Sequence, residues 1–326
     1  MRVSSGAATP HERDGDGTCM YRVAHISDLH VLAPAGVDWR AVLFNKRLTG
    51  YINLVLRRGR VHRRAYLEAV LGAASRDADH LVVTGDVTNM AFESEFLEAR
   101  ALLDEVARRV EVTVIPGNHD IYVPPVLRQR QFQRHFGPFL RSDLPDCSPD
   151  LPAGCFPCVK LRGPVAIIAL SSGVPRPPFV SAGYLGREQL AALDAVLAHP
   201  EVKRRTPVVL VHHPPVDRRI RLLQLRDGLV DAGALRRSLN ALARGLVLFG
   251  HVHRRSHCRL PTAAGVLDAV SASGAALDHP DPSVRAGLNR YEVGADGAVA
   301  TIDALALDPA GRALLPAPIP MRPPCR

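Results

Sequence analysis

The alternation of short apolar runs with polar loops is the dominant pattern along the chain. Each run has five or six residues and is followed by polar residues, which is typical of buried strands. The runs cover residues 21–26, 80–84, 111–115, 207–211 and 245–249, with a sixth at 165–170. Apolar residues at helical spacing occupy the stretches between them, at 63–78, 92–108, 187–198 and 232–243. Strand, loop and helix in alternation predict a layered α/β fold.

The two ends of the chain have a different character. Residues 1–19 are polar and lack the apolar core of a secretory signal, so we predict a disordered leader, with Met20 as a candidate start. Residues 265–276 and 288–302 predict short antiparallel strands with Gly turns, and residues 307–326 a loosely held Pro-rich tail. We therefore predict one catalytic domain over residues 20–306, with a basic insert at 38–64.

The composition excludes several classes of protein. The 326 residues are 47% hydrophobic and 22% charged, as expected for a packed globular protein. No apolar run reaches the roughly 18 residues of a transmembrane helix. Aromatic residues make up 5% of the chain, so base stacking is not indicated and we expect no nucleic-acid partner. Six sparse cysteines argue against a disulfide framework, and we predict a cytoplasmic protein.

Most of the positive charge lies in one segment. Residues 40–64 contain eight Lys or Arg and no Asp or Glu, so they account for nearly all of the formal net charge of +9. Apolar residues alternate with these charges. Such a segment suits an anionic membrane surface, which would make the protein peripheral to the inner face of the membrane, or an anionic substrate. The alternative is a helical hairpin whose apolar face packs on the core and whose Arg residues are solvated.

The five strands share a chemical feature at their carboxyl ends, because each is followed by Asp, Asn or His. In α/β folds these ends form the functional site. Carboxylate, carboxamide and imidazole groups suit Mn²⁺, Fe, Zn²⁺ or Co²⁺. Seven donors are enough for two ions that share one carboxylate, and such a pair can hold a bridging hydroxide for attack on phosphorus. The candidates are Asp28, His30, Asp86, Asn118, His212, His251 and His253.

The order of these motifs resembles the calcineurin-like metallophosphoesterase superfamily, and its bacterial phosphodiesterase branch in particular. The motifs are Asp-x-His at 28–30, Gly-Asp at 85–86, Gly-Asn-His-Asp at 117–120, His-His-Pro at 212–214 and Gly-His-x-His at 250–253. The resemblance implies a four-layer α-β-β-α sandwich of two mixed sheets flanked by helices. It also implies a dinuclear metal site at the strand ends.

The resemblance further implies a role for each residue. Asp28, His30 and His253 would bind the first ion, Asp86 would bridge, and Asn118, His212 and His251 would bind the second. His119 would face the substrate and help to protonate the leaving oxygen, and Asp120 would hydrogen-bond to His119 and orient it. Weaker candidates for substrate contacts are Asn89, His213, Arg218 and Arg219. For Asn89 the alternative is a helix N-cap, and for His213 a wall of the pocket.

The motifs predict phosphoester hydrolysis without naming the substrate. We predict a phosphodiesterase acting on a small diester, with a metal-bridging hydroxide as nucleophile. A second hypothesis is a membrane-associated pyrophosphatase of a nucleotide-linked lipid such as UDP-2,3-diacylglucosamine, although some enzymes of that activity carry Arg where this chain has His119. A third is a non-catalytic scaffold on the same fold, a reading that usually accompanies lost ligands, whereas none is lost here.

Overall fold

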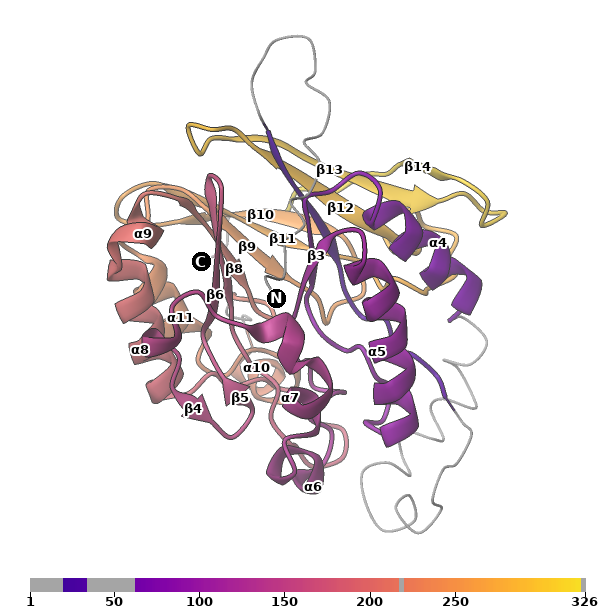
Figure 1. Ribbon diagram of the computed structural model, residues 1–326, viewed down its shortest axis with the longest axis horizontal. Coiled ribbons are helices and arrows are strands. Elements are labelled where there is room, and N and C mark those ends of the chain that lie inside the picture. Colours follow the sequence, from indigo (N-terminus) through magenta and orange to yellow (C-terminus); the bar gives the residue numbers. More distant parts are fainter. Residues whose placement is uncertain (1–19, 34–61, 217–219, 324–326) are drawn as a thin grey trace, which may run out of the picture.

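Two six-stranded sheets face each other and carry helices on their outer surfaces (Figure 1). This computed structural model describes residues 20–33, 62–216 and 220–323. The expected four-layer arrangement of two mixed sheets and flanking helices is confirmed. The first sheet has the order β14-β13-β12-β1-β2-β3 and the second has the order β10-β11-β9-β8-β7-β6. A two-stranded hairpin, β4-β5, lies outside both sheets.

The strands of the first sheet are β1 (Tyr21–Ile26), β2 (His80–Val83), β3 (Glu111–Val114), β12 (Gly287–Val293), β13 (Val299–Leu307) and β14 (Leu314–Pro316). Those of the second are β6 (Cys158–Arg162), β7 (Val165–Ala169), β8 (Thr206–Leu210), β9 (Leu246–Phe249), β10 (Ser256–Pro261) and β11 (Val266–Ser271). The hairpin consists of β4 (Asp150–Leu151) and β5 (Gly154–Cys155).

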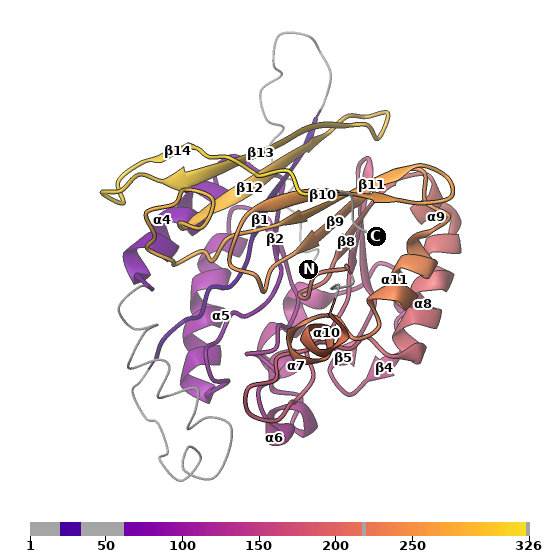
Figure 2. The same ribbon diagram turned by 180° about the vertical axis from the view of Figure 1, so that it is seen from behind.

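The helices divide between the two outer faces, as Figures 1 and 2 show. On the side of the first sheet lie α4 (Arg64–Ala74) and α5 (Glu93–Ala107), and on the side of the second lie α8 (Arg187–Ala198), α9 (Pro200–Lys203) and α11 (Ala232–Leu239). Shorter helices are α6 (Pro124–Arg128), α7 (Gln131–Phe136), α10 (Arg221–Asp227) and two 3₁₀ turns, Gly137–Leu140 and Pro145–Cys147.

The apolar runs are continuous because their strands are covered on both faces. In β8, Val208 and Leu210 belong to the large core that includes the space between the sheets, whereas the alternate residue Val209 belongs to the core under α8 and α11. β9 repeats this alternation with Leu248 and Val247. The central strands β8 and β9 therefore form from uninterrupted apolar sequences without polar alternation.

Parallel pairing brings the predicted loops to one edge. β1 is parallel to β2, β2 to β3, and β8 to β9, so their carboxyl ends share a direction within each sheet. Short loops follow at once, and their backbones bond to one another: the Asp28 amide donates to the Gly85 carbonyl oxygen at 2.9 Å, and the His30 amide to that of Asp86 at 2.9 Å. The loops after β1 and β2 are thus fixed against each other.

A partly buried charge network joins the sheets at their edge strands β3 and β6; we call it the β3–β6 seam (Tyr21, His80, Glu111, Asp143, Lys160 and Arg162). The buried Lys160 ammonium donates to the Val112 carbonyl oxygen at 2.8 Å and lies 3.2 Å from Glu111 Oε1. Arg162 pairs with both Glu111 oxygens, at 2.6 and 2.7 Å. Burial opposes ionisation of Glu111, but these cations outweigh it and lower its pKa to about 2.

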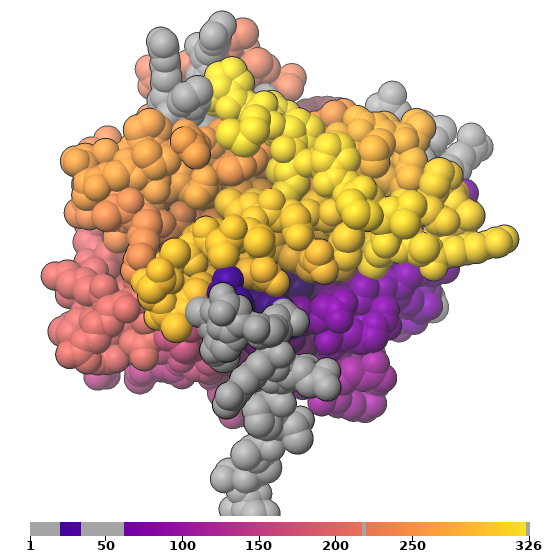
Figure 3. All heavy atoms as spheres, turned by 90° about the horizontal axis from the view of Figure 1, so that it is seen from above, coloured from indigo at the N-terminus to yellow at the C-terminus, as the bar shows by residue number. Residues whose placement is uncertain are grey.

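The C-terminal segment is held at two places, contrary to the loosely held tail that we predicted. β14 pairs antiparallel with β13. Further on, the His257 amide donates to the Pro320 carbonyl oxygen at 3.0 Å, and the Arg322 amide donates to the His257 carbonyl oxygen at 2.8 Å. Figure 3 shows these last residues, in yellow, lying across one face of the molecule. The residues between the prolines keep backbone amides and carbonyls that can pair with an edge strand. The Pro-rich segment can therefore attach to both sheets.

Several sequence predictions concern residues that the structure does not describe. The leader at 1–19, most of the basic insert at 38–64, and Arg218 and Arg219 lie outside the described residues. Cys258 on β10 takes part in a disulfide, which we did not predict, whereas Cys147, Cys155 and Cys158 are free thiols. Within the described part of the chain, none of the helices combines the length and apolarity needed to cross a bilayer.

Candidate metal centre

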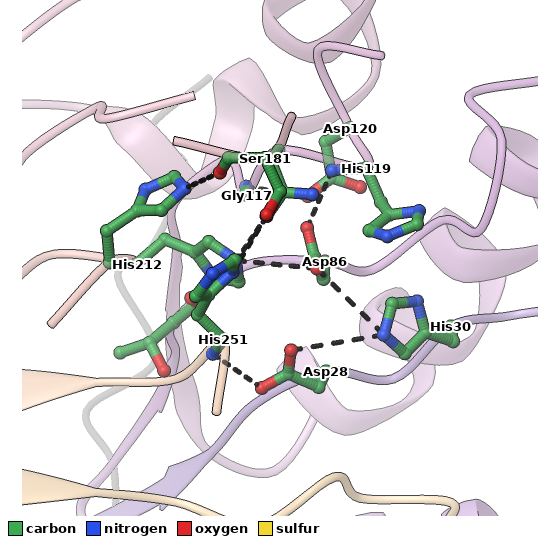
Figure 4. Close-up of polar contacts among 12 residues, drawn as sticks. Asp28, His30, Asp86, Gly117, His119, Asp120, Ser181, His212 and His251 are labelled. Carbon is green, nitrogen blue, oxygen red and sulfur yellow. Dashed lines mark hydrogen bonds and ion pairs between the residues drawn. The ribbon is translucent and has the colours of Figure 1, made fainter. Parts of the chain in front are cut away.

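The seven predicted ligands come together at the strand ends, from positions more than two hundred residues apart. Figure 4 shows Asp28, His30, Asp86 and His251 turned toward one another. The first sheet supplies Asp28, His30, Asp86 and Asn118 from the loops after β1, β2 and β3, and the second supplies His212, His251 and His253 from the loops after β8 and β9. The centre therefore spans the interface between the sheets.

The first group of donors consists of Asp28, His30, Asp86 and His253, whose ligand atoms all lie within 4.8 Å of one another. His253 Nε2 is 3.1 Å from Asp28 Oδ1 and 3.2 Å from His30 Nε2. His30 Nε2 is 3.9 Å from a carboxylate oxygen of both Asp28 and Asp86. These are the residues that we predicted for the first ion, together with the bridging carboxylate.

The second group surrounds the Asn118 carboxamide. Asn118 Oδ1 lies 3.1 Å from His212 Nε2 and 2.9 Å from His251 Nδ1. His212 Nε2 is also 3.3 Å from Asp86 Oδ2, the same oxygen that faces His30. Asp86 is therefore the residue common to both groups, in the position expected of a bridging ligand.

Backbone carbonyls determine which ring nitrogen faces the centre. A carbonyl oxygen only accepts hydrogen bonds, so the nitrogen beside it carries the proton and the other keeps a lone pair. His212 Nδ1 donates to the Thr84 carbonyl at 2.7 Å, His30 Nδ1 to that of Thr88 at 3.3 Å, and His251 Nε2 to that of Asp227 at 2.9 Å. In all three rings the remaining nitrogen faces a predicted ligand.

Left-handed backbone is concentrated at the ligands. Positive φ values occur at Asp28 (53°), His30 (45°), Asp86 (52°), His251 (68°) and His253 (49°). Asp, Asn and His are the residues other than glycine that most often adopt this region, although it is uncommon even for them. Five of the seven ligands thus share an uncommon backbone conformation. Such conformations cluster at functional sites, where the surrounding fold enforces them.

Two glycines are required by close approach at the centre. A Cβ atom on Gly117 would collide with the Asp86 side chain and lie 2.5 Å from the Asp86 amide nitrogen. A Cβ on Gly250 would collide with Ser27 Oγ and lie 2.7 Å from Asp28 Oδ2. These glycines therefore bring the backbones of separate loops close enough to hold the carboxylates in place.

The electrostatics of the centre favour ionised carboxylates beside imidazoles. Burial opposes protonation of His212, but the Asp86 carboxylate outweighs it and raises the pKa of His212 to about 9. Burial opposes ionisation of Asp86, yet His212 and His119 hold the pKa of Asp86 well below its usual range. Burial, aided by the positive charge of His212, lowers the pKa of His251 to about 4. Without a bound metal, Asp86 and His212 therefore favour the charged forms of both side chains.

The donor set fits two divalent cations. It offers two carboxylates, one carboxamide and four imidazoles, a mixed oxygen and nitrogen set of the kind that transition metals take. Among the described residues, none donates a hydrogen bond to the buried Asp28 Oδ1, which faces the His253 Nε2 nitrogen at 3.1 Å. Two imidazole nitrogens 3.2 Å apart, from His30 and His253, can both direct lone pairs to one cation. The residues present thus match the expected ions.

His119 lies beside the ligands and is partly exposed. Its ring centroid is 4.9 Å from that of His30, in edge-to-face contact. His119 Nδ1 donates to the Asn89 carbonyl oxygen at 2.5 Å, which fixes the orientation of the ring. The backbone amide of His119 donates to Asp86 Oδ1 at 2.7 Å. This placement agrees with a role toward substrate.

Asp120 does not orient the His119 ring, contrary to our prediction. Its buried carboxylate accepts hydrogen bonds from the Gly117 amide at 2.9 Å, the Thr88 amide and hydroxyl at 2.8 Å each, and the Val87 amide at 3.2 Å. Four donors fill the carboxylate, because it lies under the turn and not beside the ring. Asp120 thus ties the loop after β2 to the loop after β3.

Two of the weaker candidates, Asn89 and His213, lie in the described part of the chain. Asn89 is not the N-cap of α5, because Phe92 occupies that position and Glu95 Oε2 accepts from the amides of Met90 and Phe92 at 2.9 and 3.1 Å. His213 is fully buried and bonds to Ser172 Oγ and the Ser181 carbonyl oxygen, at 2.8 Å each. His213 therefore supports the rings of His212 and His251 from behind, where a substrate would not reach it.

Sequence reasoning missed two kinds of residue at the centre. The carbonyl oxygens of Thr84, Thr88, Asn89 and Asp227 orient the imidazoles, but any residue type supplies a carbonyl and so leaves no pattern. His62 lies next to His30, with ring centroids 5.4 Å apart, although it does not follow any of the strands that the sequence predicted. Because His62 comes at the end of the basic segment and not after a predicted strand, the sequence analysis did not consider it as a ligand.

The comparison with known families agrees with this geometry. A family model described as calcineurin-like phosphoesterase matches residues 21–255, from β1 to the loop that carries the last histidine ligand. The chain belongs to the calcineurin-like phosphoesterase family. It is therefore a metal-dependent phosphoric ester hydrolase, as the motifs predicted.

Individual proteins also resemble this chain in sequence or in fold. A "Probable cyclic nucleotide phosphodiesterase" of Rhodococcus erythropolis (strain PR4 / NBRC 100887) is 28% identical over 281 residues, which cover 84% of this chain and 77% of that protein. A purple acid phosphatase from yellow lupin seeds aligns with a TM-score of 0.57 at 10% identity, over 94% of this chain and 54% of its own. A dimetal phosphatase from Danio rerio aligns with a TM-score of 0.49 at 15% identity, over 84% and 95%.

Proposed function

We propose that this calcineurin-like phosphoesterase is a dinuclear phosphodiesterase of small diesters. The observation that carries the proposal is the shared position of Asp86, whose Oδ2 faces His30 of one donor group and His212 of the other. When bound, the two ions would supply activated water and neutralise charge on the phosphoryl oxygens. The name of the Rhodococcus relative supports a diester substrate.

The residues of this chain divide the remaining work. Asp28, His30 and His253 would hold one ion, Asn118, His212 and His251 the other, and Asp86 both. The partly exposed ring of His119 lies beside His30, where it would contact the phosphoryl group and, when protonated, donate to the leaving oxygen. Asp120 keeps the loops of Asp86 and Asn118 in register.

A comparison of substrates tests the proposal. Purified protein with Mn²⁺ is expected to hydrolyse bis-p-nitrophenyl phosphate with a higher kcat/KM than p-nitrophenyl phosphate, and a panel of cyclic nucleotides, glycerophosphodiesters and nucleotide-linked lipids would identify the diester. A preference for the monoester would overturn the diesterase assignment. A protein that binds two ions and hydrolyses none of these compounds would support the scaffold hypothesis.

One observation favours the lipid-linked pyrophosphate as a second candidate. The segment that carries α10 exposes Ile220, Leu222 and Leu225, at 58%, 73% and 47%, together with the basic residues Arg221 and Arg226. It ends at Asp227, whose carbonyl bonds to the His251 ring at 2.9 Å. Exposed leucines and arginines this close to a ligand suit an acyl chain beside an anionic group.

Vesicle sedimentation separates this candidate from the first. A lipid-active enzyme is expected to sediment with anionic liposomes at low salt and to be released at high salt. A double variant, Leu222→Ser with Leu225→Ser, would then remain in the supernatant while its turnover of bis-p-nitrophenyl phosphate is kept. Wild-type protein that stays in the supernatant at low salt would remove this candidate. The same assay tests the predicted contact of residues 40–64 with a membrane.

A further inference from the structure

His62 is attached to the fold right beside the centre. It forms an isolated antiparallel bridge with Leu277, in the segment after β11. The next residue reinforces this position, because the Arg63 amide donates to the Ala276 carbonyl oxygen at 2.8 Å and the Arg63 guanidinium lies 2.6 Å from Asp278 Oδ2. The backbone at His62 is therefore anchored independently of the seven ligands.

The imidazole of His62 forms a second histidine group that overlaps the first-ion group. One nitrogen from each of His30, His62 and His253 lies within 4.8 Å of the others. The His62 ring stands edge-on to both neighbours, with centroids 5.4 Å from His30 and 6.4 Å from His253. His30 and His253 belong to both groups, whereas His62 is not grouped with Asp28 and Asp86, so its ring would have to move toward the carboxylates to reach an ion held there.

The surroundings of His62 give its ring room to adjust. His62 and His30 border a cavity of about 90 Å³, whose other walls include Leu29, Leu67 and Leu102. The described lining of this cavity is mainly apolar, and Arg63 and Arg64 also border it. An imidazole placed between an apolar cavity and two ligand nitrogens has a cation as its most favourable additional partner.

We propose that His62 is a further ligand of the ion held by Asp28, His30 and His253. The proposal rests on the dinuclear centre proposed above. The ion would then have three imidazole ligands in addition to carboxylates, a set that favours Zn²⁺, Co²⁺ or Fe over Mg²⁺ and Ca²⁺. The end of the basic segment would thereby be joined to the ion that activates the substrate.

Cobalt titration tests this ligand directly. Metal-free wild type is expected to bind two Co²⁺ per chain, measured by visible absorption and elemental analysis. His62→Ala and His62→Gln are expected to bind one of them on the order of 10- to 100-fold more weakly and to change its absorption band. The matched control is His199→Gln, because His199 caps the distant helix α9, and it is expected to bind both ions as the wild type does.

A cysteine variant shows whether the side chain itself reaches the ion. His62→Cys with Co²⁺ is expected to give an intense near-ultraviolet thiolate-to-cobalt band, which requires a direct bond. Two ions bound at wild-type affinity in His62→Ala, with no such band in His62→Cys, would overturn the assignment of His62 while leaving the dinuclear centre intact. Wild type that binds no Co²⁺ would overturn both. A changed KM with unchanged metal affinity would make His62 a substrate contact and contradict the proposal.

Discussion

The metal centre and the β3–β6 seam both place charged side chains between the same two sheets, yet they balance charge in different ways. In the seam Glu111 contacts Lys160 at 3.2 Å and Arg162 at 2.6 Å, so its carboxylate is neutralised by permanent cations of the chain. In the centre the carboxylates of Asp28 and Asp86 face imidazoles at 3.1 to 3.9 Å, and imidazoles carry charge only when protonated.

This difference distinguishes a structural charge cluster from a binding site. The seam is complete, because the ammonium of Lys160 and the guanidinium of Arg162 both meet acceptors. In the described part of the chain, the centre keeps a buried Asp28 oxygen without a hydrogen-bond donor, and the rings of His30 and His251 each turn a lone pair inward. Burying a carboxylate oxygen and imidazole lone pairs without hydrogen-bond donors costs free energy unless a cation is bound to them. Removing residues from the two regions should therefore affect different properties.

The largest expected effect comes from the shared carboxylate. Asp86→Ala should lower kcat/KM by at least about 10³-fold, because both ions lose a ligand and several kcal/mol of charge stabilisation. Elemental analysis should show fewer than two ions per chain. Asp303→Ala, at an exposed pair with Arg290, is the control. An Asp86→Ala protein with full metal content and full rate would contradict the assignment.

His119 should affect the rate without affecting the ions. His119→Ala should bind both ions and hydrolyse an alkyl diester roughly 10²- to 10⁴-fold more slowly, because a general acid is lost. The loss should be smaller with bis-p-nitrophenyl phosphate, since p-nitrophenolate leaves without protonation. Steady-state kinetics on both substrates measure this contrast. An equal loss on both would argue against proton donation, and loss of the ions would make His119 a ligand.

The seam should affect stability alone. Lys160→Met should lower the free energy of unfolding by about 1–3 kcal/mol, because the Val112 carbonyl loses its charged donor. Metal content and kcat should stay at wild-type values. Arg290→Met, at an exposed pair, should change stability by no more than about 1 kcal/mol. Denaturant unfolding measures both, and a loss of ions from Lys160→Met would show that the two regions are not independent.

The smallest expected effect concerns protons. Burial lowers the pKa of His25 and of His80 to about 3 each, so the folded state keeps both neutral. The unfolded chain binds protons near the ordinary His pKa, and stability is therefore lost as the pH falls from about 6.5 toward 3. From pH 7.5 to 5.5 each should cost the metal-free protein about 1.4 kcal/mol.

The His80→Gln variant isolates one of these contributions. It removes a ring that bonds to Thr113 Oγ1 at 2.8 Å, so it should be less stable than wild type at pH 7.5. Between pH 7.5 and 5.5 its free energy of unfolding should fall by about 1.4 kcal/mol less than that of wild type, because one of the two histidines is gone. Urea unfolding at the two pH values gives the difference, and an unchanged pH dependence would contradict the buried neutral state.

The sequence predicts the parts of the fold that depend on short-range patterns. Runs such as residues 80–84 appear as β2 at His80–Val83, and the ligand next to each run follows the strand by only a few residues, so parallel pairing fixes its place. β14 and the C-terminal contacts were missed, because edge pairing of a Pro-rich segment depends on which strands remain unpaired.

Residues that reach the centre from elsewhere were less accessible to prediction. The role of Asp120 was wrong because a carboxylate next to His119 in sequence lies under the turn, where backbone amides and Thr88 reach it first. The backbone bridge between His62 and Leu277 positions His62 beside the centre, and no pattern of apolar and polar residues in the sequence indicates this bridge. In each case the tertiary fold decided the partner.

The left-handed backbone at the ligands limits how this centre could change its chemistry. Asp28, His30, Asp86, His251 and His253 all have positive φ, a region that Asn, Asp, His and Gly tolerate and that β-branched residues do not. Exchanges among Asp, Asn and His keep the loop shape and alter only charge and donor atom. The backbone conformation thus limits which side chains can replace these ligands, even where a different ion would favour other ligand types.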